Sequence, residues 1–272
     1  MDRTPRAAAA GGSHVTLLGG FSVRDARAVG RPVVEDLPRS VQRLVAHLCL
    51  AGRPSRAAVA GCLWPDVPDE RAQASLRSTL WRLRRSAPGL VAATPDTLRL
   101  GAGVRVDVHE LDAWADEVGD TSTGTDRLVL PPPALLGDLL PGWYDDWVLL
   151  ERDRLQQRRL HALETAAGRL CTAGRHAEAI EVAYLAIRAE PLRESAHRTL
   201  VRVHLAEGNL AEALRASAAF RDLLWRELAV PPSRRMQELV SRWQVPVPAR
   251  DPRTTRLPRP LLAAATAGAL RP

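Results

Sequence analysis

Residues 71–85 read RAQASLRSTLWRLRR and have the pattern of one amphipathic helix. Ala72, Leu76, Leu80 and Leu83 recur at spacings of four, four and three residues, which places them on one narrow stripe of a helix. The same stretch contains five arginines and no acidic residue. We therefore expect a helix that buries its apolar stripe and presents a basic face to solvent.

Two shorter helices and some strands are expected before this helix. Residues 15–23 are apolar and β-prone with a glycine break, which predicts one or two strands, and residues 30–34 predict another. Pro38 suits the first turn of a helix that ends at the Gly-Arg-Pro sequence of residues 52–54. Ser55 is a suitable N-cap for a second, shorter helix.

Short strands are expected after the basic helix, over residues 90–93, 98–100 and 104–106, with turns between them. The resulting order is strands, three helices and then a hairpin. This is the plan of a winged helix-turn-helix domain with an N-terminal sheet.

An internal repeat marks the second half of the chain. Residues 174–179 (GRHAEA) align with residues 208–213 (GNLAEA) at a period of 34 residues. Glycine at the turn and small alanines at packing positions are typical of tetratricopeptide repeats, in which paired helices approach closely. Pro191 and Pro231 are expected to end the second helix of each unit, and their wider separation predicts an insertion near residues 224–228. A generic helical hairpin repeated by chance is the alternative.

A long amphipathic helix is expected within residues 143–170. Its predicted apolar face carries Trp147, Leu150, Leu155, Leu160 and Leu163. The predicted fold class is mainly α with a small β component, an N-terminal winged helix followed by an all-α tetratricopeptide-like domain.

Composition shifts divide the chain into five segments. We expect a disordered N-terminus over residues 1–13, a winged-helix domain over 14–115 and a linker over 116–136. The helical repeat domain is expected over 137–245, followed by a disordered tail over 246–272.

The positive excess of the part of the chain that is expected to fold lies in its N-terminal third. Net charge is +7, and all 38 basic residues are arginine, an absence of lysine that we attribute to GC-rich codon usage. Residues 1–115 carry 16 arginines against 11 acidic residues, whereas residues 137–247 carry 16 against 15. A basic domain points to a polyanionic partner, most often nucleic acid.

The candidate DNA-contacting residues lie on the basic helix and in the hairpin. Arginine can pair with guanine edges or with phosphate, and the helix is third in a helix-turn-helix, which favours DNA contact over the alternative of a solvated basic face. Trp81 can lie against the DNA backbone or pack on the hairpin, and we expect the packing on the hairpin. For the hairpin residues, plain surface charge is an equal alternative. The predicted contacts are Arg71, Gln73, Arg77, Ser78, Trp81, Arg82 and Arg85 on the helix and Thr94, Arg99 and Arg105 in the hairpin.

Signatures of enzymes and of cofactor or metal sites are missing from the sequence. A phosphate-binding loop needs a lysine, and the chain has none. Neither His-Glu-x-x-His nor Gly-x-Ser-x-Gly occurs. Three separated cysteines make neither a disulfide framework nor a zinc site. We expect no enzyme activity, no cofactor and no metal. No run approaches about 18 apolar residues and no signal peptide is evident, so we expect a cytoplasmic protein without a membrane partner.

Several stretches together resemble the actinobacterial antibiotic regulatory proteins, which join an OmpR-like winged helix to a bacterial transcriptional activator domain. The resemblance covers about residues 14–245. It is carried in the first half by residues 18–23 (LGGFSV), 30–33 (GRPV), 63–66 (LWPD), 76–85 (LRSTLWRLRR) and 106–112 (VDVHELD). In the second half it is carried by residues 140–143 (LPGW), Trp147, residues 151–152 (ER) and the two repeats.

The resemblance implies a sequence-specific activator that binds double-stranded promoter DNA as a homodimer and recruits RNA polymerase, with a secondary-metabolite gene cluster as its target. It also implies that the loop carrying Asp66, Asp69 and Glu70 faces polymerase. The alternative for these acids is that they only complement the dipole of the basic helix. The chain departs from the family in the wing, where residues 96–100 read DTLRL and the family often has a Gly-Tyr-x-Leu strand. The alternative function is a protein-interaction adaptor whose winged helix does not bind specific DNA.

Overall fold

A small three-stranded sheet begins the fold of the computed structural model, which describes residues 12–24, 37–241 and 243. Strand β1 (His14–Thr16) pairs antiparallel with β2 (Ser22–Arg24), so that Val15 lies opposite Val23. Strand β5 (Arg105–Val106) pairs parallel with β1 on its other edge. The strand predicted over residues 30–34 lies outside the described residues.

Three helices follow, as predicted: α1 (Arg39–Ala51), α2 (Arg56–Leu63) and α3 (Asp69–Ser86). The Oγ of Ser55 accepts a hydrogen bond from the Ala58 amide at 3.1 Å, which confirms the predicted N-cap. Helix α3 begins two residues earlier than residues 71–85 suggest. Asp69 and Glu70 form its first turn, where negative charge complements the helix dipole. The predicted apolar stripe of α3 is buried: Ala72, Leu76, Leu80 and Leu83.

A two-stranded hairpin completes the winged helix. Strands β3 (Val91–Ala93) and β4 (Leu98–Leu100) are antiparallel, and β4 packs against α1. The Leu98 amide donates to the Pro54 carbonyl at 3.1 Å, and Ser55 and Thr97 form an isolated bridge. The hairpin is thereby fixed to the start of α2, and the predicted winged-helix plan is confirmed.

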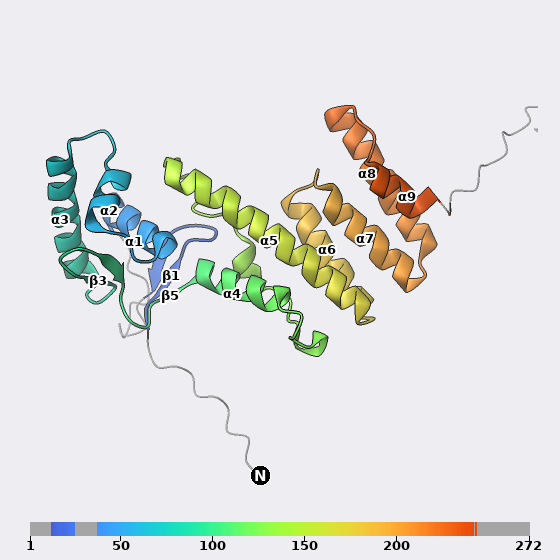
Figure 1. Cartoon of the computed structure of the whole chain (residues 1–272), viewed down its shortest axis with the longest axis horizontal. Coiled ribbons are helices and arrows are strands. Elements are labelled where there is room, and N and C mark those ends of the chain that lie inside the picture. Colours follow the sequence, from blue (N-terminus) through green and yellow to red (C-terminus); the bar gives the residue numbers. More distant parts are fainter. Residues whose placement is uncertain (1–11, 25–36, 242, 244–272) are drawn as a thin grey trace, which may run out of the picture.

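The second half of the chain is a stack of antiparallel helices (Figure 1). Its helices are α5 (Asp146–Thr172), α6 (His176–Ala189), α7 (Glu194–Glu207), α8 (Leu210–Leu228) and α9 (Arg234–Ser241). Each helix from α5 to α8 packs against its neighbour in the chain.

The turns between paired helices confirm the repeat alignment. Gly174 and Gly208 both have positive φ, 75° and 85°, a conformation that favours glycine. Ala179 and Ala213 are both fully buried, as small residues at close helix crossings must be. Tetratricopeptide-like packing is therefore confirmed over the two helix pairs.

For one residue of α5, the predicted position on the apolar face is wrong. Leu150 is 72% exposed, whereas Leu155, Leu160 and Leu163 are buried. Five residues turn a helix by about 500°, so Leu150 lies about 140° away from Leu155 and off the apolar stripe.

Helix α4 (Asp107–Gly119) and the segment after it connect the two halves. This segment contains two short 3₁₀ helices, η1 (Thr125–Arg127) and η2 (Pro133–Leu136). Leu128 and Leu135 are buried, and α4 packs against α5. One apolar core thus runs from the winged helix through the predicted linker into the repeats.

The carboxylate of Asp107 joins the N-terminal sheet to α4. It accepts hydrogen bonds from the amides of Leu17 and Leu18 at 2.8 and 2.7 Å and from the Val108 amide at 2.8 Å. Burial raises the pKa of Asp107, and these backbone hydrogen bonds act in the opposite direction. The backbone at Leu17 also contacts the connecting segment, because the Leu140 amide donates a hydrogen bond to the Leu17 carbonyl at 2.9 Å.

Within the described ranges, no helix is both long and apolar enough to cross a membrane.

Replacing Ala179 or Ala213 with leucine should overpack the helix pairs. We expect the free energy of unfolding to fall by about 1–3 kcal/mol in each variant, measured by circular dichroism melts of the whole chain. Ala177 and Ala211 occupy exposed positions two residues earlier in each repeat, so Ala177→Leu and Ala211→Leu are matched controls that should leave the midpoint nearly unchanged. Equal midpoints in all four variants would refute the repeat alignment.

Replacing Asp107 with alanine should destabilise the fold because it leaves buried amides without an acceptor. We expect a loss of about 1–3 kcal/mol or more in chemical denaturation, and a smaller loss for Asp107→Asn, which keeps one oxygen. Glu110 lies on the same helix and makes an ion pair with exposed Arg105, so Glu110→Ala should cost less than about 1 kcal/mol. A loss no larger for Asp107→Ala than for Glu110→Ala would contradict this role.

Candidate nucleic-acid interface

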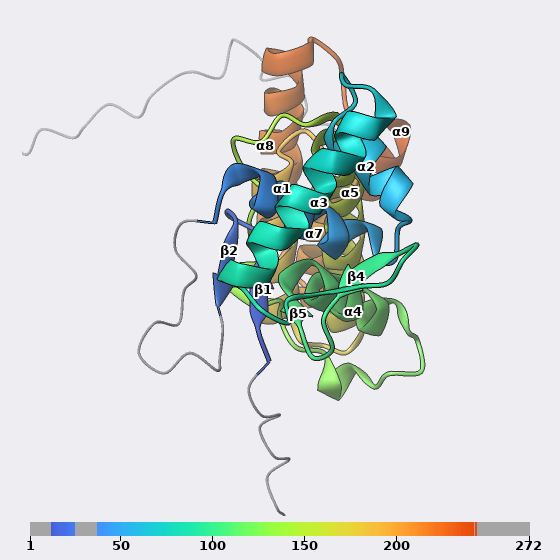
Figure 2. The ribbon, with the colours of Figure 1, turned by 90° about the vertical axis from the view of Figure 1, so that its left-hand side faces the viewer.

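Helix α3 lies at one end of the long axis of the molecule, and α8 and α9 lie at the other (Figure 1). Seen from that end, α3 crosses the front of the winged helix, with β4 below it (Figure 2). Its outward face carries most of the predicted site. The exposed residues are Arg71, Arg77, Ser78, Trp81, Arg82 and Arg85, while Gln73 is half-buried.

The arginines of α3 make no hydrogen bond or ion pair with any residue that the structure describes. Their one described contact is the Arg85 guanidinium, which lies 4.9 Å from the Trp81 ring centroid. The expectation that Trp81 packs on the hairpin is wrong, because its side chain is 59% exposed. The hairpin packs instead against α1 and the start of α2. The α3 face therefore offers cations and an aromatic ring that an external partner can contact.

Four arginines of the helical half have a different environment. Arg152, Arg159, Arg169 and Arg175 each donate to backbone carbonyls of the segment between α4 and α5, and we call these four residues the arginine clasp. Arg152 reaches the carbonyls of Leu139, Leu140 and Trp143 at 2.9–3.0 Å.

The most buried member of the clasp is Arg159, which is 5% exposed. It donates to the carbonyls of Leu136 and Gly137 at 2.7 and 2.8 Å. Burial lowers the pKa of its guanidinium, and nearby Asp138 opposes that shift. Farther along α5, Arg169 donates to the carbonyls at the end of α4 and just beyond it.

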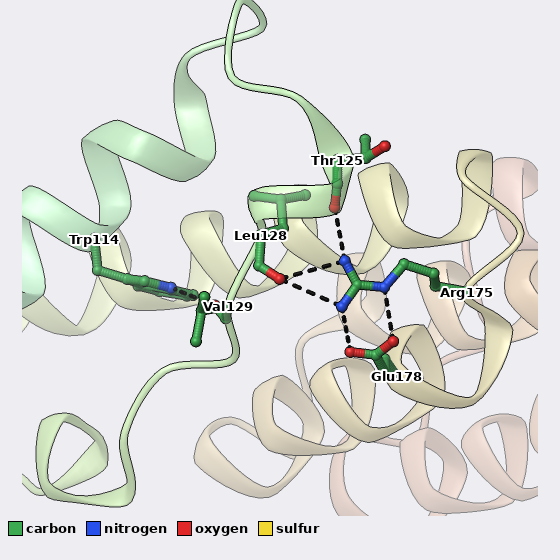
Figure 3. Close-up of polar contacts among 6 residues, drawn as sticks. All are labelled: Trp114, Thr125, Leu128, Val129, Arg175 and Glu178. Atoms are coloured by element: carbon green, nitrogen blue, oxygen red, sulfur yellow. Dashed lines mark hydrogen bonds and ion pairs between the residues drawn. The ribbon is translucent and has the colours of Figure 1, made fainter. Parts of the chain in front are cut away.

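Figure 3 shows how the clasp holds the segment at Arg175. Its guanidinium donates to the Thr125 carbonyl at 2.6 Å and to the Leu128 carbonyl at 3.3 Å, while Glu178 accepts from its other edge. In the same view the Trp114 indole donates to the Val129 carbonyl at 3.1 Å. These cations are committed to internal contacts, in contrast to those of α3.

The three hairpin residues of the predicted site do not share one environment. Thr94 is exposed, but its hydroxyl is used inside the turn, where it contacts Thr97 Oγ1 at 2.9 Å. Arg99 is exposed on β4 and has no ion pair with a described residue. Arg105 lies on β5 in the other sheet and pairs with Glu110 at 2.5 Å. The structure thus brings Thr94 and Arg99 together on the hairpin and separates Arg105 from them.

Arg56 belongs to this surface although the sequence analysis did not include it. Its Nη1 donates to the Thr94 carbonyl at 3.0 Å, which places a half-buried cation where the hairpin meets the start of α2. The sequence does hold a signal, because a cation in the first turn of a helix opposes the helix dipole. The hydrogen bond to the Thr94 carbonyl shows what the cation does at this position: it joins the hairpin to the start of α2.

The acidic loop between α2 and α3 lies next to the α3 face. Asp66 is in the loop itself, and Asp69 and Glu70 are in the first turn of α3. All three are exposed, and none pairs with a described cation. Phosphates would repel these carboxylates. The loop therefore suits a basic partner, whereas the neighbouring α3 face suits an anionic one.

Nothing in the described part of the chain gathers three or more His, Cys, Asp or Glu side chains in a group that could hold a metal ion.

The second half of the chain matches the family described as Bacterial transcriptional activator domain over residues 134–242. Two regulatory proteins are similar to a larger part of it. Regulatory protein AfsR of Streptomyces coelicolor is 30% identical over 223 residues, which are 78% of this chain and 22% of that protein. Regulatory protein AfsR of Streptomyces griseus is 30% identical over 205 residues, which are 70% of this chain and 21% of that protein. The chain thus spans about a fifth of the length of these relatives, both of which are named as regulatory proteins.

A solved structure supports the fold. Mycobacterium tuberculosis EmbR, in complex with a low affinity phosphopeptide, superposes with a TM-score of 0.66 at 19% identity, covering 85% of this chain and 65% of that one. This likeness agrees with a winged helix followed by tetratricopeptide-like helices. The chain is therefore AfsR-like: its second half matches the bacterial transcriptional activator domain over residues 134–242, and most of its length is similar to the two regulatory proteins.

Proposed function

We propose that the chain is a sequence-specific, DNA-binding transcriptional activator that works in the cytoplasm on promoter DNA. The observation that carries the proposal is the contrast between two sets of arginines. Those of the clasp are bonded to backbone carbonyls, whereas those of α3 make no hydrogen bond or ion pair with a described residue. Cations left unpaired on the third helix of a winged helix suit the major groove of a duplex.

The hairpin and Arg56 add contacts beside the helix in this proposal. Arg56 and Arg99 would bind phosphates and fix the register of α3 without reading bases. Arg105 contributes less, because Glu110 already neutralises it. A homodimer on direct repeats would present two such faces to the promoter. The resemblance to the antibiotic regulatory proteins supports secondary-metabolite genes as targets.

The adaptor alternative makes a different prediction about DNA. An adaptor with a degenerate winged helix would bind the promoter no better than unrelated duplex. A comparison of specific with non-specific affinity at a fixed salt concentration separates the two functions.

Replacing Arg77, Arg82 and Arg85 together with alanine should weaken promoter binding strongly. We expect a loss of about 1–3 kcal/mol of binding free energy for each residue that reads a base. For each arginine that binds a phosphate, we expect the affinity to depend less steeply on salt. Fluorescence anisotropy with the cognate promoter at several salt concentrations measures both effects.

The matched control for this variant removes the same charge from the helical half. Arg188, Arg202 and Arg235 are exposed and have no ion pair within the described residues, so their triple alanine variant should keep its affinity. If the α3 triple variant binds the promoter as tightly as the unaltered chain, α3 does not contact DNA.

Replacing Asp66 and Asp69 with asparagine should separate binding from activation. If the loop contacts a basic patch on RNA polymerase, the variant should hold its promoter affinity in a gel shift and yield less transcript in a reconstituted assay. Helix-dipole complementation alone predicts only a small loss of stability, about 0.3–1 kcal/mol per charge.

The control for the loop is Asp126→Asn with Asp153→Asn, two exposed acids outside it. This pair should leave transcript unchanged. Normal transcript from the loop variant would remove the loop from activation, and a parallel loss of binding would assign it to folding or DNA docking.

A further inference from the structure

Helix α1 contacts the start of α5 through a row of side chains away from the α3 face. Helix α5 begins beside the winged helix and runs away from it (Figure 1). On α1, residues spaced by four lie along one face of the helix. We call the row the α1–α5 seam, and it pairs Arg39, Arg43 and His47 of α1 with Trp143, Asp145 and Trp147 at the start of α5.

The three contacts of the seam differ in kind. The Cζ of Arg39 lies 3.5 Å from the centroid of the Trp143 ring. Arg43 Nη2 lies 2.5 Å from Asp145 Oδ1, and the two side chains are only 24% and 16% exposed. The rings of His47 and Trp147 meet edge to face, with their centroids 5.2 Å apart. A cation–π contact, an ion pair and an aromatic contact thus join α1 to one short segment of chain.

The side chain of Asp145 serves the seam rather than its own helix. Asp145 occupies the N-cap position of α5, where an aspartate usually accepts a hydrogen bond from an amide of the first turn. Its side chain makes no such bond and pairs with Arg43 instead. Burial and the charge of Arg43 lower the pKa of Arg39, and Asp145 opposes this shift. Asp145 is therefore the counter-charge of two arginines that lie one turn apart.

The opposite face of α1 belongs to the winged helix. Val41, Leu44, Val45 and Leu48 are buried, and α1 packs against α3 and β4. At about 100° per residue, Arg43 lies roughly 100–160° away from these residues around the helix. Helix α1 is thus packed on one side by α3 and the hairpin and on the other by the start of α5.

The seam also contacts two other parts of the winged helix. The ring of Phe21, just before β2, stacks on Trp143 with the centroids 6.0 Å apart. Cys62, near the end of α2, has its Sγ 3.8 Å from Nδ1 of His47. A movement at the start of α5 would therefore reach the N-terminal sheet, α1 and α2 together.

We propose that the seam orients α3 for DNA, with Arg43 and Asp145 as positioning residues that do not touch the duplex. The inference rests on the proposed DNA-binding function and adds that residues outside the winged helix set its affinity. A mostly buried ion pair suits this role, because it is little screened by salt and its geometry is specific. Since α3 packs on α1, a change that loosens the seam also loosens α3.

Promoter affinity of the full chain tests the proposal through the sign of the effect. Asp145→Ala removes an acidic charge, so long-range electrostatics alone would strengthen binding to DNA. We expect it instead to weaken promoter binding about 3- to 10-fold, because Arg39 and Arg43 lose their counter-charge and the seam opens. Asp146 is exposed and has no ion pair with a described residue, so Asp146→Ala is a control of equal charge that should not weaken binding.

Two further variants separate the ion pair from general stability. Arg43→Ala/Asp145→Ala should bind no more weakly than Arg43→Ala alone, because the second change removes a partner that is already lost. Asp145→Asn keeps the shape of the side chain without its charge and should also weaken binding, which covers the case of an alanine variant that folds poorly.

Hydrogen–deuterium exchange without DNA provides the second measurement. In Asp145→Ala, the backbone amides of α1 and α3 should exchange several-fold faster than in Asp146→Ala, while those of α7 and α8 should not change. Promoter affinity that is unchanged or higher in Asp145→Ala and Asp145→Asn would overturn the proposal. Faster exchange spread equally over α7 and α8 would also overturn it, since Asp145 would then act on general stability. If the unaltered chain binds no promoter, the DNA-binding function fails, and the exchange of α3 still decides whether the seam positions it.

Discussion

The buried carboxylate of Asp107 is the interaction on which the joining of the two halves depends. It fixes the amides of Leu17 and Leu18, and the neighbouring carbonyl of Leu17 accepts from Leu140, which leads into α5. The N-terminal sheet, α4 and the connecting segment therefore meet at two consecutive residues. Leaving a buried amide without an acceptor costs more free energy than one hydrogen bond contributes. Few other side chains can therefore replace Asp107.

Arginine has two separate uses in this chain. In the clasp, a planar group with five donors satisfies several carbonyls of an irregular segment at once, which a lysine could not do with fixed geometry. On α3, the same side chain is left without a partner among the described residues. The identical residue type thus stabilises the fold in the clasp and remains available to an outside anion on α3, and only the environment distinguishes the two sets.

Local periodicity accounts for what the sequence predicts well. The stripe through Leu76 and the turn at Gly208 follow from side-chain spacing and from backbone conformation, both of which are local. The contacts of Arg175 could not be predicted, because it binds backbone carbonyls about 50 residues away and every residue has a carbonyl. The predictions that Trp81 and Leu150 are packed are wrong, because the hydrophobicity of a residue alone does not say whether it is buried. The DNA contacts on α3 remain a prediction.

The shared core joins the winged helix to the helices from α4 to α7, and α7 packs in turn against α8 and α9. In the DNA-bound state that we propose, the helical half must rotate with α3 around the duplex axis. Shifting a binding site by about five base pairs, half a helical turn, would carry the far end to the opposite side of the DNA. The orientation of the repeats relative to any neighbouring protein is therefore set by the phase of the site along the helix.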